Sequence, residues 1–168
     1  MNLYLMRHGL AVERGTPGYD NDGERPLTPK GERKVRRVAE ALLQMEVVFE
    51  VILSSPLVRA RQTAEALLAE VKAPEKLQLT EHLAPGGRAK ELVKLIQELP
   101  GPPQNVLLVG HEPDLGQFAS LLLSGGDNAV SIPFKKGGVA RLTVDRWRAS
   151  RCASLEWLLT SRQMEMMT

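Results

Sequence analysis

The stretch that decides the fold is Leu-Tyr-Leu-Met-Arg-His-Gly, residues 3–9 of a chain of 168 residues. A short apolar run that stops at a turn-forming glycine is typical of a buried strand. In an open α/β sheet, the residues that follow a parallel strand lie at the carboxyl edge, where ligands bind. We therefore expect Arg7 and His8 to lie at a binding edge. The alternative interpretation is a strand whose polar end is simply solvated.

Composition places the chain among ordinary globular proteins and indicates a single domain over residues 1–168. Apolar residues make up 43% of the chain and charged residues 25%, which excludes a disordered protein. The net charge of +2, with no long block of like charge, argues against a nucleic-acid partner. No signal peptide or transmembrane-length apolar run is present, so we expect a soluble, cytoplasmic protein with no membrane partner. The single cysteine, Cys152, excludes an internal disulfide and is expected to be a buried, inert thiol.

Beyond the first strand, segments of strand character alternate with segments of helical periodicity. Strands are predicted at residues 47–53, 76–80, 105–109, 129–134, 139–144 and 154–159. Helices are predicted from about residue 29 to 45, 57 to 71, 91 to 99 and 115 to 123, with Thr28 and Asp114 as N-caps. Residues 11–27 are rich in turn formers and predict a long loop, which either forms part of a site or is merely mobile. The tail after Thr160 is expected to be frayed.

This alternation favours an α/β fold: a mostly parallel central sheet covered on both faces by helices, in three α/β/α layers. Right-handed crossovers place the ends of the first, second and fourth strands at one edge. Arg7, His8, Arg59, His111 and Glu81 are expected to converge there. Arg59 and Arg61 lie in the first turn of their helix and oppose its dipole, which hints that at least one of them binds something anionic. The alternative is a surface arginine with no role.

The chemistry of this set favours phosphoryl transfer. Guanidinium groups suit a dianionic oxyanion, which they bind through several charge-assisted hydrogen bonds. A neutral imidazole can attack phosphorus and form a covalent intermediate, and neighbouring arginines lower its pKa and keep it neutral. A second, protonated histidine can stabilise the charge on the transferring oxygens.

Four segments of the chain resemble the motifs of the histidine phosphatase superfamily, which has the phosphoglycerate mutase-like fold. They are Leu-Met-Arg-His-Gly (5–9), Arg-Pro-Leu-Thr (25–28) with Gly31, Ser-Ser-Pro-Leu-Val-Arg-Ala-Arg-Gln-Thr-Ala (54–64) and Val-Gly-His (109–111). The resemblance implies that His8 is the nucleophile and becomes a phosphohistidine. It implies that Arg7, Arg59 and His111 bind the phosphoryl oxygens, and that neither a metal nor an organic cofactor is needed. Arg61 matches no phosphate-binding position.

Two departures from the family pattern concern polar groups. Many members carry Glu-Thr after Arg-His-Gly, whereas this chain has Leu10 and Ala11, so one polar contact to the phosphate pocket is missing. Many members also place an acidic proton donor after the third strand. Glu81 is the candidate here, although its flanking residues do not match the usual pattern, and His82 is the next candidate.

The short chain leaves little room for a lid, and an open site suits a phosphoryl group presented on a protein surface. The Arg-Pro-Leu-Thr segment (25–28) and the short chain look most like the SixA branch, phosphohistidine phosphatases that act on histidine phosphotransfer domains. Such a partner, a phosphorylated protein, is the first expectation. The alternatives are a small phosphorylated substrate, turned over by a phosphomonoesterase or mutase on the same fold, and a non-catalytic phosphate-binding adaptor.

Overall fold

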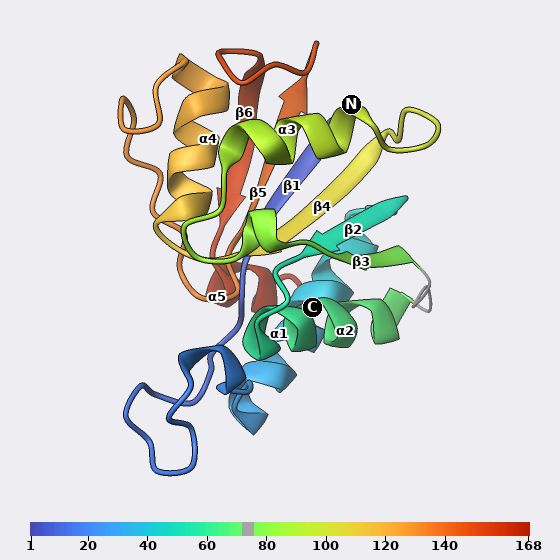
Figure 1. Cartoon of the computed structure of the whole chain (residues 1–168). Helices are drawn as coiled ribbons and strands as arrows, with labels where there is room; N and C mark the ends of the chain where they lie inside the picture. Colours follow the sequence, from blue (N-terminus) through green and yellow to red (C-terminus); the bar gives the residue numbers. More distant parts are fainter. Residues whose placement is uncertain (72–75) are drawn as a thin grey trace.

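The computed structural model of the chain describes residues 1–71 and 76–168. A six-stranded sheet forms its centre, in the order β3-β2-β4-β1-β5-β6 (Figure 1). The strands are β1 (Asn2–Arg7), β2 (Val51–Ser54), β3 (Leu77–Leu79), β4 (Asn105–Gly110), β5 (Val139–Val144) and β6 (Ala153–Leu159). The pairs among β1 to β4 are parallel, whereas β5 and β6 pair antiparallel at one side. The predicted mostly parallel sheet is confirmed.

Helices cover both faces of the sheet, which gives the predicted three layers (Figure 1). The helices are α1 (Pro29–Gln44), α2 (Val58–Val71), α3 (Ala89–Gln97), α4 (Asp114–Ser124) and α5 (Ser161–Glu165), with short 3-10 turns η1 (Asp22–Glu24) and η3 (Glu81–Leu83). Successive side chains of β1 point to opposite faces of the sheet and so belong to two separate hydrophobic cores. Tyr4 and Met6 pack with α1, α2 and α5, whereas Leu3 and Leu5 pack with α3 and α4.

The strand register brings the ends of β1, β2 and β4 together. Arg7 is paired with Gly110, and Ser54 with Val109, so these strands stop at the same level of the sheet. The residues that follow them are therefore neighbours, as expected for the carboxyl edge of a parallel sheet. Thr28 caps α1 by accepting a hydrogen bond from the Gly31 amide, which confirms that predicted helix start.

The strand predicted at residues 129–134 does not form. Pro133 has no backbone N–H to donate to a ladder. The amide of Phe134 instead donates to Glu112 Oε1, and its carbonyl accepts from Arg7 Nη1. The segment is an irregular connection in which the ring of Phe134 is buried. The backbone groups of Phe134 bind Arg7 and Glu112, two residues at the carboxyl edge of the sheet.

The C-terminal tail is also not frayed as predicted. Thr160 and Gln163 form a capping box that starts α5, and Met164 is fully buried in the core with α1. A smaller correction concerns α4, where Asp114 is the first helical residue and Pro113 occupies the cap. Cys152 is buried, as expected. Among the described residues, no helix has both the length and the apolar character needed to cross a bilayer.

Candidate active site

His8 is held by the turn that follows β1. Its Nδ1 lies 2.8 Å from the Gly9 carbonyl oxygen, which can only accept, so Nδ1 carries the proton. The other ring nitrogen, Nε2, therefore carries a lone pair, which accepts a hydrogen bond from the Nε–H of Arg59 at 3.3 Å. The turn itself is fixed to α2, because the Gly9 amide donates to Thr63 Oγ1 at 3.0 Å. The nucleophile proposed from the sequence thus has a defined tautomer and orientation.

His111, directly after β4, lies against His8. The two ring centroids are 5.1 Å apart, with the planes inclined by 53°. His111 Nε2 is 2.8 Å from the Ser55 hydroxyl oxygen, which accepts from the Leu57 amide and can donate its own proton to Nε2. In that arrangement the neutral ring of His111 carries its proton on Nδ1. His111 Nδ1 is buried and has no hydrogen-bond partner in the described part of the chain. A buried polar atom of this kind calls for a partner, and a bound oxyanion supplies one.

Arg7, at the end of β1, is oriented by the irregular segment before β5. Its Nη1 donates to the Phe134 carbonyl at 2.8 Å, and the Phe134 amide donates to Glu112 Oε1 at 3.0 Å. The Nε of Arg7 is buried and unpartnered among the residues that the structure describes. Arg7 therefore has one donor occupied by the scaffold and others that remain available to a ligand.

Asp22, in η1, holds the far side of Arg59. Arg59 Nη1 donates to the Asp22 carbonyl at 2.7 Å, and Nη2 to the carboxylate Oδ2 at 3.1 Å. The other carboxylate oxygen, Oδ1, accepts from Arg14 Nε at 2.8 Å and from Arg25 Nε at 2.9 Å. One carboxylate thus ties three guanidinium groups together and leaves the Nε–H of Arg59 directed at His8.

Burial and positive charge keep both histidines neutral. Burial lowers the pKa of His8 to about 3. The hydrogen bond to the Gly9 carbonyl opposes this shift, and His111, Arg59 and Arg7 each lower the pKa by a smaller amount. Burial also lowers the pKa of His111 to about 4, helped by Arg59. Burial raises the pKa of the Asp22 carboxyl, but hydrogen bonds and charges from Arg25, Arg59 and Arg14 outweigh it and lower that pKa overall. At neutral pH the site therefore combines uncharged imidazoles with an ionised carboxylate. The sequence-based expectation of a protonated second histidine is wrong for the unliganded protein, because burial and the neighbouring arginines disfavour the charged form of His111.

These groups line a cavity of about 580 Å³ at the carboxyl edge of the sheet. Its cationic lining is formed by Arg7, Arg14, Arg25, Arg59 and Lys136. Its acidic lining is formed by Glu13, Glu112 and Asp114. The surplus of guanidinium and ammonium groups favours a small anion with several oxygens.

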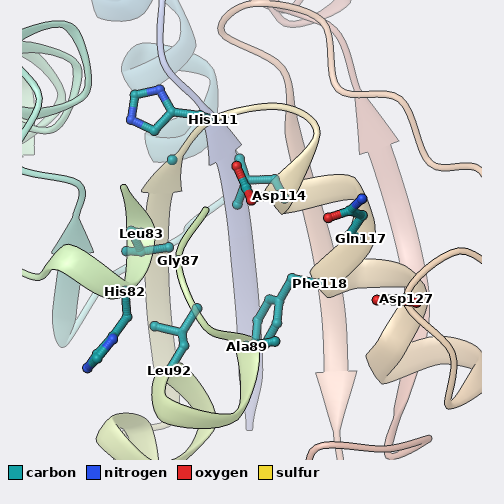
Figure 2. Close-up of a pocket in the computed structure, with 12 residues that line it drawn as sticks. His82, Leu83, Gly87, Ala89, Leu92, His111, Asp114, Gln117, Phe118 and Asp127 are labelled. Carbon is teal, nitrogen blue, oxygen red and sulfur yellow. The ribbon is translucent and has the colours of Figure 1, made fainter. Parts of the chain in front are cut away.

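The structure brings four of the five predicted site residues together, namely Arg7, His8, Arg59 and His111. Glu81 is exposed in η3 and is not among the residues that line the cavity. His82 is half-buried beside a neighbouring pocket, and its ring lies at the opposite end of that pocket from His111 (Figure 2). Arg61 faces Glu65 on the surface of α2.

Sequence reasoning missed Asp22. The Asn-Asp-Gly-Glu run at 21–24 indicates only a turn, and nothing local shows that its carboxylate reaches α2. A signal was nevertheless present in Arg59 and Arg61, whose positions against the helix dipole hinted that at least one of them has an anionic partner. Leu10 and Ala11, where many family members have polar residues, instead join the loop to α1: Leu10 O accepts from the Thr28 amide, and Ala11 forms a bridge with Leu27.

Comparison with known proteins gives a consistent family. Residues 3–85 match the model of the histidine phosphatase superfamily, branch 1. The chain is 41% identical over 143 residues to an uncharacterized protein of Picosynechococcus, covering 84% of each chain. It is 28% identical over 160 residues to the phosphohistidine phosphatase SixA of Escherichia coli, covering 90% of this chain and 95% of that one.

The fold is similar to that of a solved SixA. The structure of the protein histidine phosphatase SixA complexed with tungstate superimposes with a TM-score of 0.80 at 26% identity. The match covers 96% of this chain and 98% of the SixA chain. The similarity therefore extends over both layers of helices and the whole sheet.

Proposed function

This chain belongs to the histidine phosphatase superfamily, in its SixA-type branch, and from that premise we propose that it dephosphorylates phosphohistidine in proteins through a covalent intermediate on His8. The observation that carries the proposal is the directed lone pair of His8 Nε2, with Arg59 Nε 3.3 Å away and the tilted His111 ring beside it at a centroid distance of 5.1 Å. A nucleophilic nitrogen at the centre of fixed cationic donors is what transfer of a dianionic phosphoryl group requires.

In the first step, the phosphoryl oxygens accept hydrogen bonds from Arg7, Arg59 and His111. His8 Nε2 attacks phosphorus, a new N–P bond forms, and the bond from phosphorus to the imidazole of the substrate breaks. The electron pair of that bond stays on the leaving imidazole, which is protonated by water. Because His8 starts neutral, no proton has to be removed before attack.

In the second step, water attacks the phosphorus of phosphorylated His8. The N–P bond breaks, its electron pair returns to Nε2, and inorganic phosphate leaves after the attacking water has lost a proton. The net reaction consumes one water molecule and regenerates neutral His8. The unpartnered Nδ1 of His111 and Nε of Arg7 supply donors for the equatorial oxygens in both steps.

The absence of Glu81 from the cavity lining supports a phosphoramidate substrate. Imidazole is a better leaving group than the alkoxide of a phosphate ester, so breaking a P–N bond needs less help from a proton donor. The solved SixA is complexed with tungstate, a tetrahedral oxyanion like phosphate, which supports a phosphoryl-binding function for this chain. A histidine phosphotransfer domain is the partner that we propose.

One observation favours a second candidate, a small-molecule phosphomonoesterase. Glu112 lines the cavity, and burial raises the pKa of its carboxyl although the Phe134 amide opposes the shift. A carboxyl with a raised pKa can protonate an alkoxide leaving group. Glu112 Oε1 is already engaged by the Phe134 amide, however, so this candidate ranks second.

The test compares two substrate classes under the same conditions. Initial rates of phosphate release are measured with a histidine phosphotransfer domain phosphorylated on histidine and with a panel of sugar phosphates. We expect kcat/KM to be at least on the order of 100-fold higher for the phosphoprotein, which corresponds to about 2.7 kcal/mol of transition-state stabilisation. Faster turnover of a sugar phosphate would instead assign the chain to the second candidate.

A further inference from the structure

A second pocket, of about 170 Å³, adjoins the cavity of His8 (Figure 2). Its apolar wall comes from η3, α3 and α4 and consists of Leu83, Leu92, Leu115 and Phe118, each at most 5% exposed. The two hollows share His111 and Asp114. The second pocket therefore lies next to the cavity in which a phosphoryl group at His8 would be bound.

The second pocket differs in charge from the phosphoryl site. Two carboxylates, Asp114 and Asp127, belong to its lining, and none of the described lining residues is lysine or arginine. Asp114 Oδ1 accepts from the Gly86 amide at 3.2 Å, and Asp127 Oδ1 from Asn128 Nδ2 at 3.2 Å. Both contacts are to neutral groups, and neither carboxylate forms an ion pair with a described residue, so both are available to a cationic ligand.

We propose that this pocket binds a lysine or arginine side chain of the protein substrate, close to its phosphohistidine. The proposal rests on the function proposed above. The methylene stem of such a side chain packs against Leu92 and Phe118, and its charged head reaches the two carboxylates. A leucine or phenylalanine side chain would fill the same walls but would remove water from Asp114 and Asp127 without replacing it by a cation, which is unfavourable.

The arrangement separates two kinds of recognition. The arginines of the first cavity bind the phosphoryl group and are indifferent to the chain that carries it. The second pocket makes no contact with the phosphoryl group and binds a neighbouring residue of the substrate. Small phosphoramidates, which lack such a residue, use only the first cavity. The second pocket therefore affects the choice among phosphoproteins and not the chemical step.

The test uses peptides with one central phosphohistidine in an alanine and serine background, in which a single lysine is moved through the flanking positions. For the wild type, we expect lysine at one or two positions to raise kcat/KM about tenfold over alanine, and glutamate at the same positions to lower it. Asp127→Asn and Ala89→Phe, which remove a charge and narrow the pocket, should each abolish most of this preference. Both variants should hydrolyse phosphoramidate itself at the wild-type rate.

Asp145→Asn is the matched control, because Asp145 is an exposed aspartate just after β5, at the opposite edge of the sheet. It should leave the lysine preference unchanged. Hydrolysis of all peptides at equal rates, a preference for leucine, or a lysine preference that survives both pocket variants would overturn the pocket proposal alone. Failure to hydrolyse any phosphohistidine peptide or phosphoramidate, alongside turnover of a sugar phosphate, would overturn both proposals.

Discussion

At the scale of single residues, the site depends on hydrogen bonds that orient the phosphate-binding and nucleophilic side chains. Arg59 is the clearest case. Its Nη1 and Nη2 are occupied by Asp22, and this leaves Nε–H directed at the attacking nitrogen of His8. Asp22 touches neither His8 nor, in the proposed reaction, the phosphoryl group. It is therefore a positioning residue that acts through Arg59.

A double-mutant cycle tests this role. Asp22→Asn removes the ionic contact, lets Arg59 turn away from His8, and is expected to lower kcat by on the order of 10- to 100-fold. In an Arg59→Gln background, Asp22→Asn should lower kcat little further, because the guanidinium group that Asp22 positions is already absent. Initial-rate kinetics of the four proteins give the coupling.

Asp20→Asn serves as the control, since Asp20 is an exposed aspartate two residues away. It should leave kcat within about twofold of the wild type, as a surface substitution usually does. Strictly additive losses in the cycle would show that Asp22 acts independently of Arg59. A fall in thermal stability without a fall in kcat would show that it only holds the loop together.

At this scale the sequence predicts residues that follow strands but misses those supplied by loops. Arg7, His8 and His111 directly follow apolar runs, so strand topology alone predicts their convergence. Asp22 lies in a segment without periodicity, and its partner Arg59 is distant in the chain. Glu81 shows the reverse failure. It also follows a strand, but β3 is at the edge of the sheet, and the η3 turn leaves Glu81 exposed outside the cavity lining.

At the scale of elements, the two wrong predictions have physical causes. Residues 129–134 have the β-branched composition of a strand, yet Pro133 lacks a donor and Phe134 gives its backbone groups to Glu112 and Arg7. The tail after Thr160 shows no clear hydropathy pattern because α5 is short. Its capping box and the buried side chain of Met164 hold it against α1.

Met164 provides a test at this scale. It is fully buried, so Met164→Ala should lower the free energy of unfolding by about 2–5 kcal/mol through the cavity left between α5 and α1. Met166, two residues later, is 80% exposed, and Met166→Ala should change it by less than about 0.5 kcal/mol. Urea denaturation measures both. Equal stability of the two variants would mean that α5 is not docked.

At the scale of the whole molecule, the site makes the fold sensitive to acid. The folded chain holds the pKa of His8 at about 3 and that of His111 at about 4, whereas the unfolded chain has the ordinary value near 6.5. Below about pH 6.5 these two histidines therefore bind protons in the unfolded state but not in the folded state. The stabilisation that comes from these two neutral histidines is fully present above pH 6.5 and is lost as the pH falls towards 4 and then 3.

Equilibrium unfolding between neutral pH and about pH 4 measures this effect. Each histidine should contribute a slope approaching about 1.4 kcal/mol per pH unit well below pH 6.5, and His8→Asn or His111→Asn should remove its own share. The lowered pKa of Asp22 adds a loss in the same direction at lower pH. An unchanged slope in both histidine variants would contradict the assignment of buried, neutral imidazoles.

The central claim concerns a covalent bond to His8, and trapping that intermediate tests it most directly. The protein is mixed with a phosphohistidine substrate, quenched at alkaline pH, digested, and mapped by mass spectrometry. We predict an acid-labile phosphoryl group on His8. The His8→Asn variant should show neither this group nor phosphate release. A phosphoryl group on another residue, or undiminished phosphate release by His8→Asn, would contradict the mechanism.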